Sequence, residues 1–503
     1  MIKEYLPKIK KILWAGFLVS LPVTNFPYFP AGLGGSRVSV RPLLLYPLVL
    51  LIIVILPTFW KRKLPKAWLP FFVFVILALI SSGLPIFQGA TSQLSEVTII
   101  SRVVRTLITL FLAAAIYLIV SLIPLNEEDL QFTLKWLFIG LIIALIWGTL
   151  QIIYVLDLVP NWYKIMRKIQ RYISINKGIP DRIIGLTQEP SWFADQLSAL
   201  WLPWIFSAVL MNKTVFKRSW GWITVEKILL VWMAVVLVFT LSRSGLVVAA
   251  VVVGSGVVFF IPKRDPSIQY KQRAGVLGKI QSRYNNLPAV LRTVIPALVI
   301  FGVFISLLYF ASLESKYISR MWKYWVGQSA EFQAIGSKSL GGYFRYIGFG
   351  PRFVYWETAY RIFAQNPIFG VGLGNYTFHF QDTFPAVQFG YMPELLKTLV
   401  PDYSRVITAK NYFARLLAET GLLGTAAFGT FLIVLAGNGF YLWLSKDSEV
   451  KFWGAGGLLG LIAFFVDAFS YDSLAIPNPW IIFGLITASF SVFTKSSHQK
   501  EER

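Results

Sequence analysis

The chain has 503 residues, 56% of which are hydrophobic, and a net charge of +23. Its mean hydropathy of +0.63 excludes an ordinary soluble protein of this length. The absence of cysteine excludes disulfides and cysteine-ligated zinc, and two histidines, His379 and His498, are too few for a histidine-rich metal site. The positive charge suits cytoplasmic anchoring residues, and any remainder on the other side would suit an anionic substrate.

Apolar runs that are long enough to cross a bilayer recur along most of the chain. Helices are the expected spanning structure, because backbone groups cannot stay unpaired in hydrocarbon and the alternating pattern of a β-barrel is not visible. The sequence therefore predicts an all-α, polytopic integral membrane protein whose basic and then apolar N-terminus is an uncleaved first span. The roughly twelve predicted spans cover residues 12–29, 42–60, 67–87, 99–124, 132–157, 190–211, 222–241, 244–262, 291–312, 411–443, 452–470 and 478–495.

Lysine and arginine in the short loops predict the orientation, because cytoplasmic loops carry an excess of basic residues. Basic residues fall in alternate loops, which predicts an even number of spans with both termini in the cytoplasm. The acidic loop around Glu127, Glu128 and Asp129 departs from this pattern. The expected cytoplasmic basic segments are residues 61–66, 213–218, 263–292 and 446–451 and the C-terminal tail, and the third would face anionic lipid head groups.

Two polar segments then face the outer side, and the second, nearly a hundred residues long, is predicted to form amphipathic helices at the membrane surface. No internal repeat is visible, which weighs against a transporter built from inverted repeats. The predicted organisation is residues 1–157 (helices 1–5), 158–189 (outer loop), 190–312 (helices 6–9), 313–410 (large outer loop) and 411–503 (helices 10–12 and the tail).

The segment TLSRSG, residues 240–245, forms a predicted outer turn between two spans and carries Arg243. An arginine at this position is ordinarily an interfacial residue whose side chain reaches water. The alternative is a phosphate clamp, because a guanidinium binds phosphate oxygens through two parallel hydrogen bonds. Spacing alone leaves both interpretations open.

A predicted helix in the large outer loop carries Arg352 and Trp356, which are four residues apart and share one face. Glu357 and Arg361 have the order and spacing of a structural salt bridge. The face with Arg352 and Trp356 is therefore a candidate substrate-binding face. The face with Glu357 and Arg361 has an ordinary structural explanation.

Gly370, Gly372 and Gly374 follow this helix and look at first like a nucleotide-binding loop. A lone glycine run that follows a helix is weak evidence for that function. We interpret the run as a bend that lets the backbone pass close to the membrane or the substrate.

Polar residues mark the outer ends of two further spans. Lys410 and Asn411 open the tenth span, where a lysine is ordinarily an interface anchor, and Glu419 lies further in. An acid inside a span is costly, so Glu419 is a candidate for function or for a buried pair. Glu189 precedes Pro190, which suits the first turn of a helix, so Glu189 is either a helix-terminal acid or a catalytic base at the outer face.

These four blocks together resemble the O-antigen polymerase and ligase superfamily over roughly residues 180–440. No single motif is specific, whereas their order and spacing are. The matching residues are Ser242–Arg243, then Arg352, Trp356 and Pro367–Tyr376, then Asn411 and Glu419–Gly424. The block around Glu189 is more similar to polymerases, and Lys410 stands where ligases carry a histidine.

The resemblance implies a GT-C-like glycosyltransferase in the bacterial inner membrane, with its large loop in the periplasm and no cofactor. Its donor would be an undecaprenyl-pyrophosphate-linked glycan, attacked by a sugar hydroxyl of a second lipid-linked glycan. Developing charge on the leaving pyrophosphate requires preorganised cations. The outer loops contain no clustered acidic motif, so we expect arginine and lysine to serve without a metal. The expected roles are pyrophosphate clamp for Arg243, Arg352 and Lys410, base for Glu189, and weaker phosphate or glycan contacts for Arg182, Arg102, Trp356 and Asn411.

Three functions stay open at this point. A repeat-unit polymerase, with a possible chain-length regulator as partner, is favoured by Lys410 and the Glu189 block. A ligase that transfers finished glycan to lipid A core or another acceptor is the alternative within the superfamily. A flippase or other transporter would instead predict repeats and charged residues along many spans at mid-membrane. Nothing in the sequence indicates a nucleic-acid partner.

Overall fold

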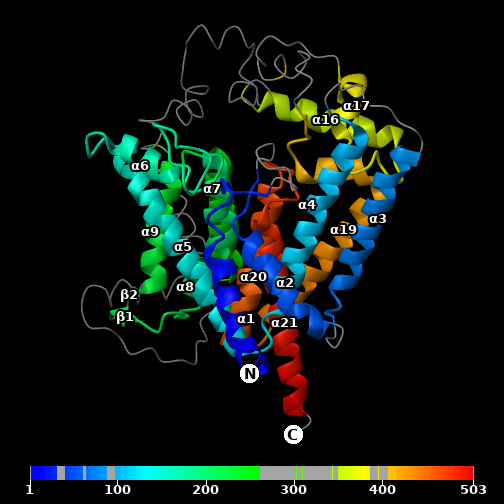
Figure 1. Cartoon of the computed structure of the whole chain (residues 1–503). Helices are drawn as coiled ribbons and strands as arrows, with labels where there is room; N and C mark the ends of the chain where they lie inside the picture. Colours follow the sequence, from blue (N-terminus) through cyan, green and yellow to red (C-terminus); the bar gives the residue numbers. More distant parts are fainter. Residues whose placement is uncertain are drawn as a thin grey trace.

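The computed structural model describes residues 2–30, 40–59, 64–87, 97–220, 223–260, 349–385 and 406–501, with the single residues Gly302, Tyr309, Tyr343 and Leu395. Helices make up nearly all of the regular structure in these segments, which confirms the all-α class. Both termini lie at one end of the bundle, called the lower face here, and α6, α16 and α17 lie at the other end, the upper face (Figure 1). The predicted span 291–312, the basic segment 263–292 and most of the loop 313–410 lie outside the described residues.

Each remaining predicted span overlaps a helix. The helices are α1 (Ile2–Val19), α2 (Leu45–Phe59), α3 (Trp68–Phe87), α4 (Ile99–Leu122), α5 (Glu127–Val155), α6 (Trp162–Gln170), α7 (Pro190–Asp195), the π-helical turn η3 (Gln196–Trp201), α8 (Leu202–Leu210), α9 (Val225–Phe239), α10 (Arg243–Phe260), α16 (Gly350–Gln365), α17 (Tyr376–Thr383), α19 (Tyr412–Trp443), α20 (Ser448–Asp467) and α21 (Pro477–Glu501). Two short strands, β1 (Ser219–Trp220) and β2 (Ile223–Thr224), pair antiparallel.

Within the described segments, 6 helical stretches are long and apolar enough to cross a membrane. They are α3, α4, α5, the continuous helix Pro190–Leu210, α19 and α20, and α2 and α10 are shorter apolar helices. The chain is therefore an integral membrane protein, while the total of twelve spans and the GT-C-like architecture stay predictions.

The predicted first span, residues 12–29, is displaced. The helix begins at Ile2 and ends at Val19, so the basic N-terminal stretch is itself helical. Pro22, Pro27 and Pro30 follow the helix, and proline lacks the N–H that an interior helical position must donate. Residues 20–30 therefore form turns and an isolated bridge between Asn25 and Arg41.

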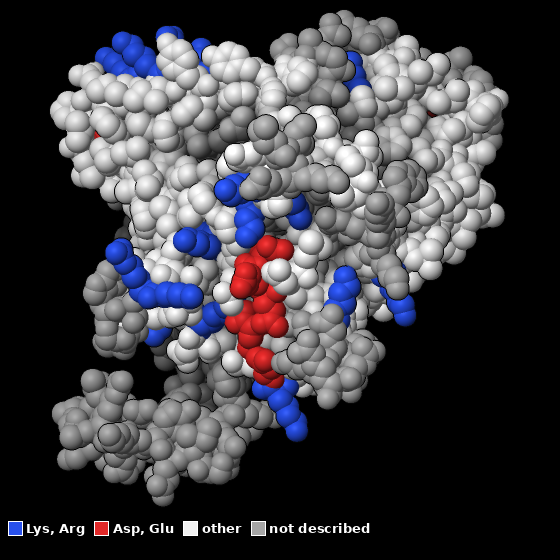
Figure 2. All heavy atoms as spheres, turned by 60° about the horizontal axis from the view of Figure 1, so that its bottom comes forward, with Lys and Arg blue, Asp and Glu red and all other residues white. Residues whose placement is uncertain are grey.

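Charged side chains gather on the lower face, where acidic residues form one group flanked by lysine and arginine (Figure 2). Lys213 forms an ion pair with Glu449. Burial lowers the pKa of Lys213, and the fields of Glu449, Glu127 and Asp447 oppose that shift. The acidic loop that departs from the charge pattern thus lies beside basic residues, at the same end of the bundle as the termini.

Helix α19 is kinked at Gly421, where its backbone packs against the segment that follows α16. Gly421 has φ 62°, in the left-handed region, and a Cβ there would lie 2.4 Å from the carbonyl oxygen of Ile368. We expect Gly421→Ala to lower the free energy of unfolding by more than about 2 kcal/mol, because it adds backbone strain and a steric clash. Gly429→Ala is the control in the same helix, since a Cβ there meets nothing within 4 Å. Thermal denaturation in detergent would show equal stability of both variants if the kink were not required.

Candidate functional site

The connection between α20 and α21, at the upper face, receives polar contacts from two segments that are far apart in the sequence, the start of α16 and the start of α19. Arg352, near the start of α16, donates from Nη1 to the carbonyl oxygens of Lys410 at 3.4 Å, Phe469 at 3.2 Å and Ser470 at 3.1 Å. The backbone N–H of Tyr412 donates to the carbonyl of Ala468 at 2.8 Å. These contacts fix the Arg352 guanidinium beside Lys410 in advance of any ligand.

Lys410 and Asn411 form the entrance to α19. Asn411 is its N-cap, and its Oδ1 accepts from the backbone N–H of Ala414 at 3.0 Å. Lys410 has φ 54°, and its backbone N–H donates to Oδ2 of Asp472 at 2.8 Å. The Lys410 side chain is exposed. Histidine, the ligase residue here, is among the side chains enriched in this left-handed conformation.

Glu419 belongs to a buried ion pair. Its Oε2 accepts from Nε of Arg415 at 2.9 Å, and both side chains are nearly inaccessible. Arg415 also donates from Nη1 to the carbonyl of Asp472 at 2.6 Å. Arg102 of α4 lies in the field of Arg415, Glu419 and Asp472 and donates from Nε to the carbonyl of Gly374 at 3.2 Å. The buried-pair interpretation of Glu419 is thereby confirmed, and Arg102 and Asp472 join the same cluster.

The glycine segment forms the predicted bend, and its backbone passes close to neighbouring helices, while its approach to membrane or substrate stays a prediction. Gly370, Gly372 and Gly374 all have positive φ. A Cβ on Gly370 would lie 2.6 Å from the carbonyl of Ala418 in α19, and one on Gly374 would lie 2.3 Å from Oγ1 of Thr106 in α4. The segment needs glycine because its backbone lies against neighbouring helices.

Trp356 contacts three phenylalanines, Phe349, Phe353 and Phe469, with ring centroids 6.0, 5.4 and 5.8 Å away. It therefore connects α16 to the end of α20, as Arg352 does. Glu357 and Arg361 form the predicted salt bridge at 2.7 Å on the exposed side of α16. Arg352 and Trp356 thus face the α20–α21 connection, whereas Glu357 and Arg361 lie on the exposed side of α16.

A second group of polar residues surrounds α7. Glu189 is the N-cap residue of α7 without a side-chain capping bond, and its carboxylate is exposed near the Ser191 hydroxyl, at 3.4 Å. Arg243 begins α10, whose Gly245 is packed so closely on Ala194 that an added Cβ would lie 2.4 Å from the Cβ of Ala194. Arg243 also lies in electrostatic range of Tyr343, in the predicted large loop.

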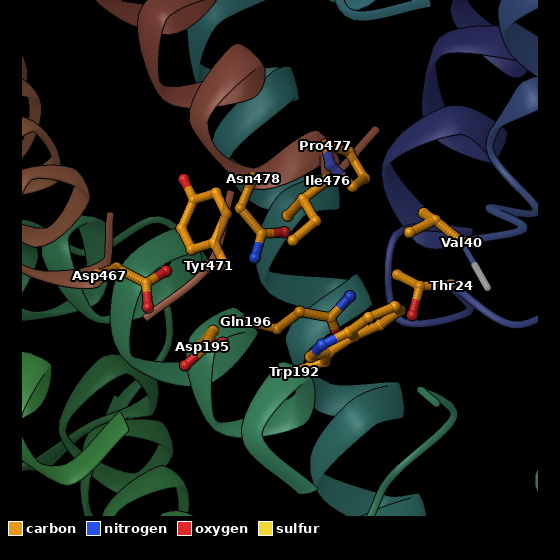
Figure 3. A pocket seen from close by; sticks show the side chains of 10 residues that line it. All are labelled: Thr24, Val40, Trp192, Asp195, Gln196, Asp467, Tyr471, Ile476, Pro477 and Asn478. Carbon is orange, nitrogen blue, oxygen red and sulfur yellow. The ribbon is translucent and has the colours of Figure 1, made fainter. Parts of the chain in front are cut away.

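Asp195 links the two groups. It lines one small pocket with Asp467, the last residue of α20 (Figure 3), and lies in the fields of Asp467, Arg352 and Glu189. The structure therefore brings Glu189 and Arg352, more than 160 residues apart in the sequence, to one region of the upper face. Arg182 is half-buried and forms an isolated β-bridge with Ile179.

Some members of the site were missed in the sequence. Arg415 precedes Glu419 by four residues, the same spacing that identifies Glu357 and Arg361, and could have been found from it. Asp195 and Asp467 are single acids at the ends of apolar helices, and neither has a partner nearby in the sequence. Within the described residues, no cluster of three or more His, Asp or Glu side chains could hold a metal.

Burial determines the protonation state of two further side chains in this part of the structure, His379 and Tyr471. Burial lowers the pKa of His379, so its imidazole is neutral near pH 7, although the field of Asp382 opposes this shift. Burial raises the pKa of Tyr471 well above its ordinary value, so its hydroxyl keeps its proton. Neither group therefore carries a charge near pH 7.

Residues 228–429 match the sequence model of a protein family described as O-antigen ligase. The match includes the Ser242–Arg243 turn, the α16 segment and the start of α19, and it confirms the resemblance to the O-antigen polymerase and ligase superfamily. No curated protein matches the chain.

Proposed function

Because residues 228–429 match the O-antigen ligase family, we propose that this integral membrane protein of the bacterial inner membrane is a glycosyltransferase of surface-polysaccharide assembly. It polymerises repeat units carried on undecaprenyl pyrophosphate at the periplasmic face. The upper face of the bundle is then the periplasmic one, and both termini are cytoplasmic. The observation that carries the proposal is the Arg352 guanidinium, held by three backbone carbonyls beside Lys410.

The proposed reaction joins two lipid-linked glycans. A hydroxyl of the acceptor sugar attacks the anomeric carbon of the donor, the bond from that carbon to the pyrophosphate oxygen breaks, and lipid pyrophosphate leaves. Arg243, Arg352 and Lys410 stabilise the negative charge that develops on the leaving group, and their fixed positions require no reorganisation during the reaction. Glu189, whose carboxylate is exposed at the same face, takes the hydroxyl proton.

Two features favour a polymerase over a ligase. Lys410 stands at the ligase histidine position, and an ammonium there binds pyrophosphate more readily than it accepts a proton. The block around Glu189 supplies a carboxylate base at the upper end of the Pro190–Leu210 helix. A ligase that uses a separate acceptor is the second candidate, supported by the name of the matching family.

A lipid-linked glycan transporter is the alternative from another class. Such a protein would be expected to carry polar groups along its spans near the middle of the membrane. The polar clusters described above, around Asp472 and around Asp195, lie at helix ends on the upper face, which fits chemistry at one membrane surface better.

Reconstitution with one defined undecaprenyl-pyrophosphate oligosaccharide tests the function. We expect the wild type to give a ladder of products on a gel, and Lys410→Ala and Glu189→Gln to reduce it at least about 100-fold, the usual magnitude for a lost charge-stabilising or acid–base group. Transfer that occurs only with a separate acceptor such as lipid A core would identify a ligase. No product under either condition would refute both enzymes and leave the transporter.

A further inference from the structure

Helix α6 is fixed beside the upper end of α5, one of the candidate membrane spans (Figure 1). At the start of α6, Nε1 of Trp162 donates to the carbonyl of Leu150 at 2.8 Å. At its end, Oε1 of Gln170 accepts from Nε2 of Gln151 at 2.7 Å, and both amides are buried. Because α5 leaves the bilayer at this end, α6 lies at the depth of the membrane interface, where tryptophan is enriched.

One exposed row of side chains on α6 is apolar. The buried side chains of the helix are Met166 and Gln170, which face the bundle. Ile165 and Ile169 form a second row, four residues apart, and they are 44% and 45% exposed. With about 3.6 residues per turn, this apolar row is turned roughly 100° from the buried one. Tyr172, in the turn that follows the helix, extends the row and is 57% exposed. The helix therefore presents apolar surface that the described part of the bundle does not cover.

A basic row lies next to the apolar row. Lys164 and Lys168 are exposed and four residues apart, and Arg171 continues their row. Nη2 of Arg171 donates to the Tyr172 hydroxyl at 3.0 Å, which places the guanidinium beside the apolar row. Residues 158–180 contain no acid, and their basic residues are Lys164, Arg167, Lys168, Arg171 and Lys177. Apolar and cationic rows on one helix at this depth are complementary to the surface of an anionic bilayer.

We propose that α6 lies in the upper membrane interface and binds the anionic head groups of bilayer phospholipids, of the class of phosphatidylglycerol. Ile165 and Ile169 enter the boundary between head groups and acyl chains, and Lys164 and Lys168 contact the lipid phosphates. The charge of the helix decides the choice of partner, because a lipid without net charge would leave the basic row without a counter-charge. In Figure 1, α6 and α16 lie on opposite sides of the upper face, so this surface is separate from the Arg352 site.

A single fluorescent label on α6 tests the proposal, because the chain contains no cysteine and one introduced cysteine is the only labelling site. Ile169→Cys, carrying a bimane label, would be reconstituted in phosphatidylcholine vesicles that contain brominated phosphatidylcholine or brominated phosphatidylglycerol, which quench on contact. We expect the phosphatidylglycerol to quench this label at least about 5-fold more effectively at equal mole fraction, the preference that one lysine near an anionic surface contributes. Arg167→Cys is the matched label on the opposite side of the helix, and aqueous iodide should quench it more strongly than either lipid.

Charge variants in the Ile169→Cys protein make the expected result specific. Lys164→Gln with Lys168→Gln should lower the preference for phosphatidylglycerol to less than about 2-fold, while phosphatidylcholine still quenches because the apolar row is unchanged. Lys217→Gln with Arg218→Gln removes two exposed charges beside β1, at the lower face, and should keep the original preference.

Two results would overturn the proposal. An Ile169 label that neither lipid quenches would show that water or protein covers the apolar row. Equal quenching by the two lipids would refute the anionic head group as the partner. Both measurements need no glycan substrate, so either failure would leave the proposed glycosyl transfer untouched.

Discussion

Arg352→Ala is expected to reduce polymer formation by about 10²–10³-fold in the reconstituted assay, at unchanged expression and stability. The guanidinium is held by three carbonyl oxygens and is therefore placed before the pyrophosphate arrives. Arg352→Lys should restore little activity, because an ammonium cannot reproduce the planar set of donors that contacts carbonyls and phosphate together. Product ladders, quantified against donor concentration, would measure the loss.

The matched control is Arg361→Ala on the same helix. Arg361 is exposed and pairs with Glu357, and exposed pairs contribute about 0–1 kcal/mol. Its removal should change neither stability nor polymer output noticeably. If Arg352→Ala kept wild-type output, or if both variants lost it equally, the proposed clamp would be wrong.

Arg415→Ala is expected to lower the free energy of unfolding by about 3–5 kcal/mol, the cost of leaving one member of a buried ion pair alone. Glu419 is 1% exposed and accepts its charged hydrogen bond from Arg415 within α19. Arg415 also holds the carbonyl of Asp472, so its loss should loosen the connection that supports Arg352. Thermal denaturation of the purified protein in detergent would measure the effect.

Two further variants distinguish the loss of the Arg415–Glu419 ion pair from a general effect of removing an arginine. Arg105→Ala removes an exposed arginine from α4 and should change stability by less than about 0.5 kcal/mol. The double variant Arg415→Met with Glu419→Leu should recover much of the lost stability, because apolar side chains of similar volume leave no unpaired buried charge. A double variant as unstable as Arg415→Ala would show that the Asp472 contact, and not the ion pair, carries the stability.

The cluster around Asp472 explains why several candidate residues recur together in one segment of the sequence. Lys410, Asn411, Arg415 and Glu419 lie at or just before the start of one helix, where capping, backbone donation and the ion pair each have a separate partner. Lys410 contributes its backbone N–H to this framework, and its side chain is exposed. Residues that hold the helix start in place, such as Asn411 and Arg415, can thus be close in sequence to a proposed ligand-binding residue, Lys410, and still have a different role.

Composition and the spacing of apolar runs were enough to predict an all-α membrane protein, because a span must be helical and about 20 residues long. Local signals were equally reliable where partners are near in sequence: Pro190 begins α7, and Glu357 pairs with Arg361 four residues later. The apolar run misplaced only the first span, because the helix includes the basic stretch from Ile2 and ends at Val19, before Pro22.

Contacts between helices could not be predicted from the sequence, because no local sequence pattern specifies which helix ends lie next to each other. Asp195 and Asp467 each look like an isolated acid near one end of an apolar helix, and they meet only because the start of the Pro190–Leu210 helix and the end of α20 lie at the same face. The partners of Arg352 are backbone carbonyls, which every residue has and which no sequence motif identifies. Packing of the helices therefore decided which polar residues meet at the upper face.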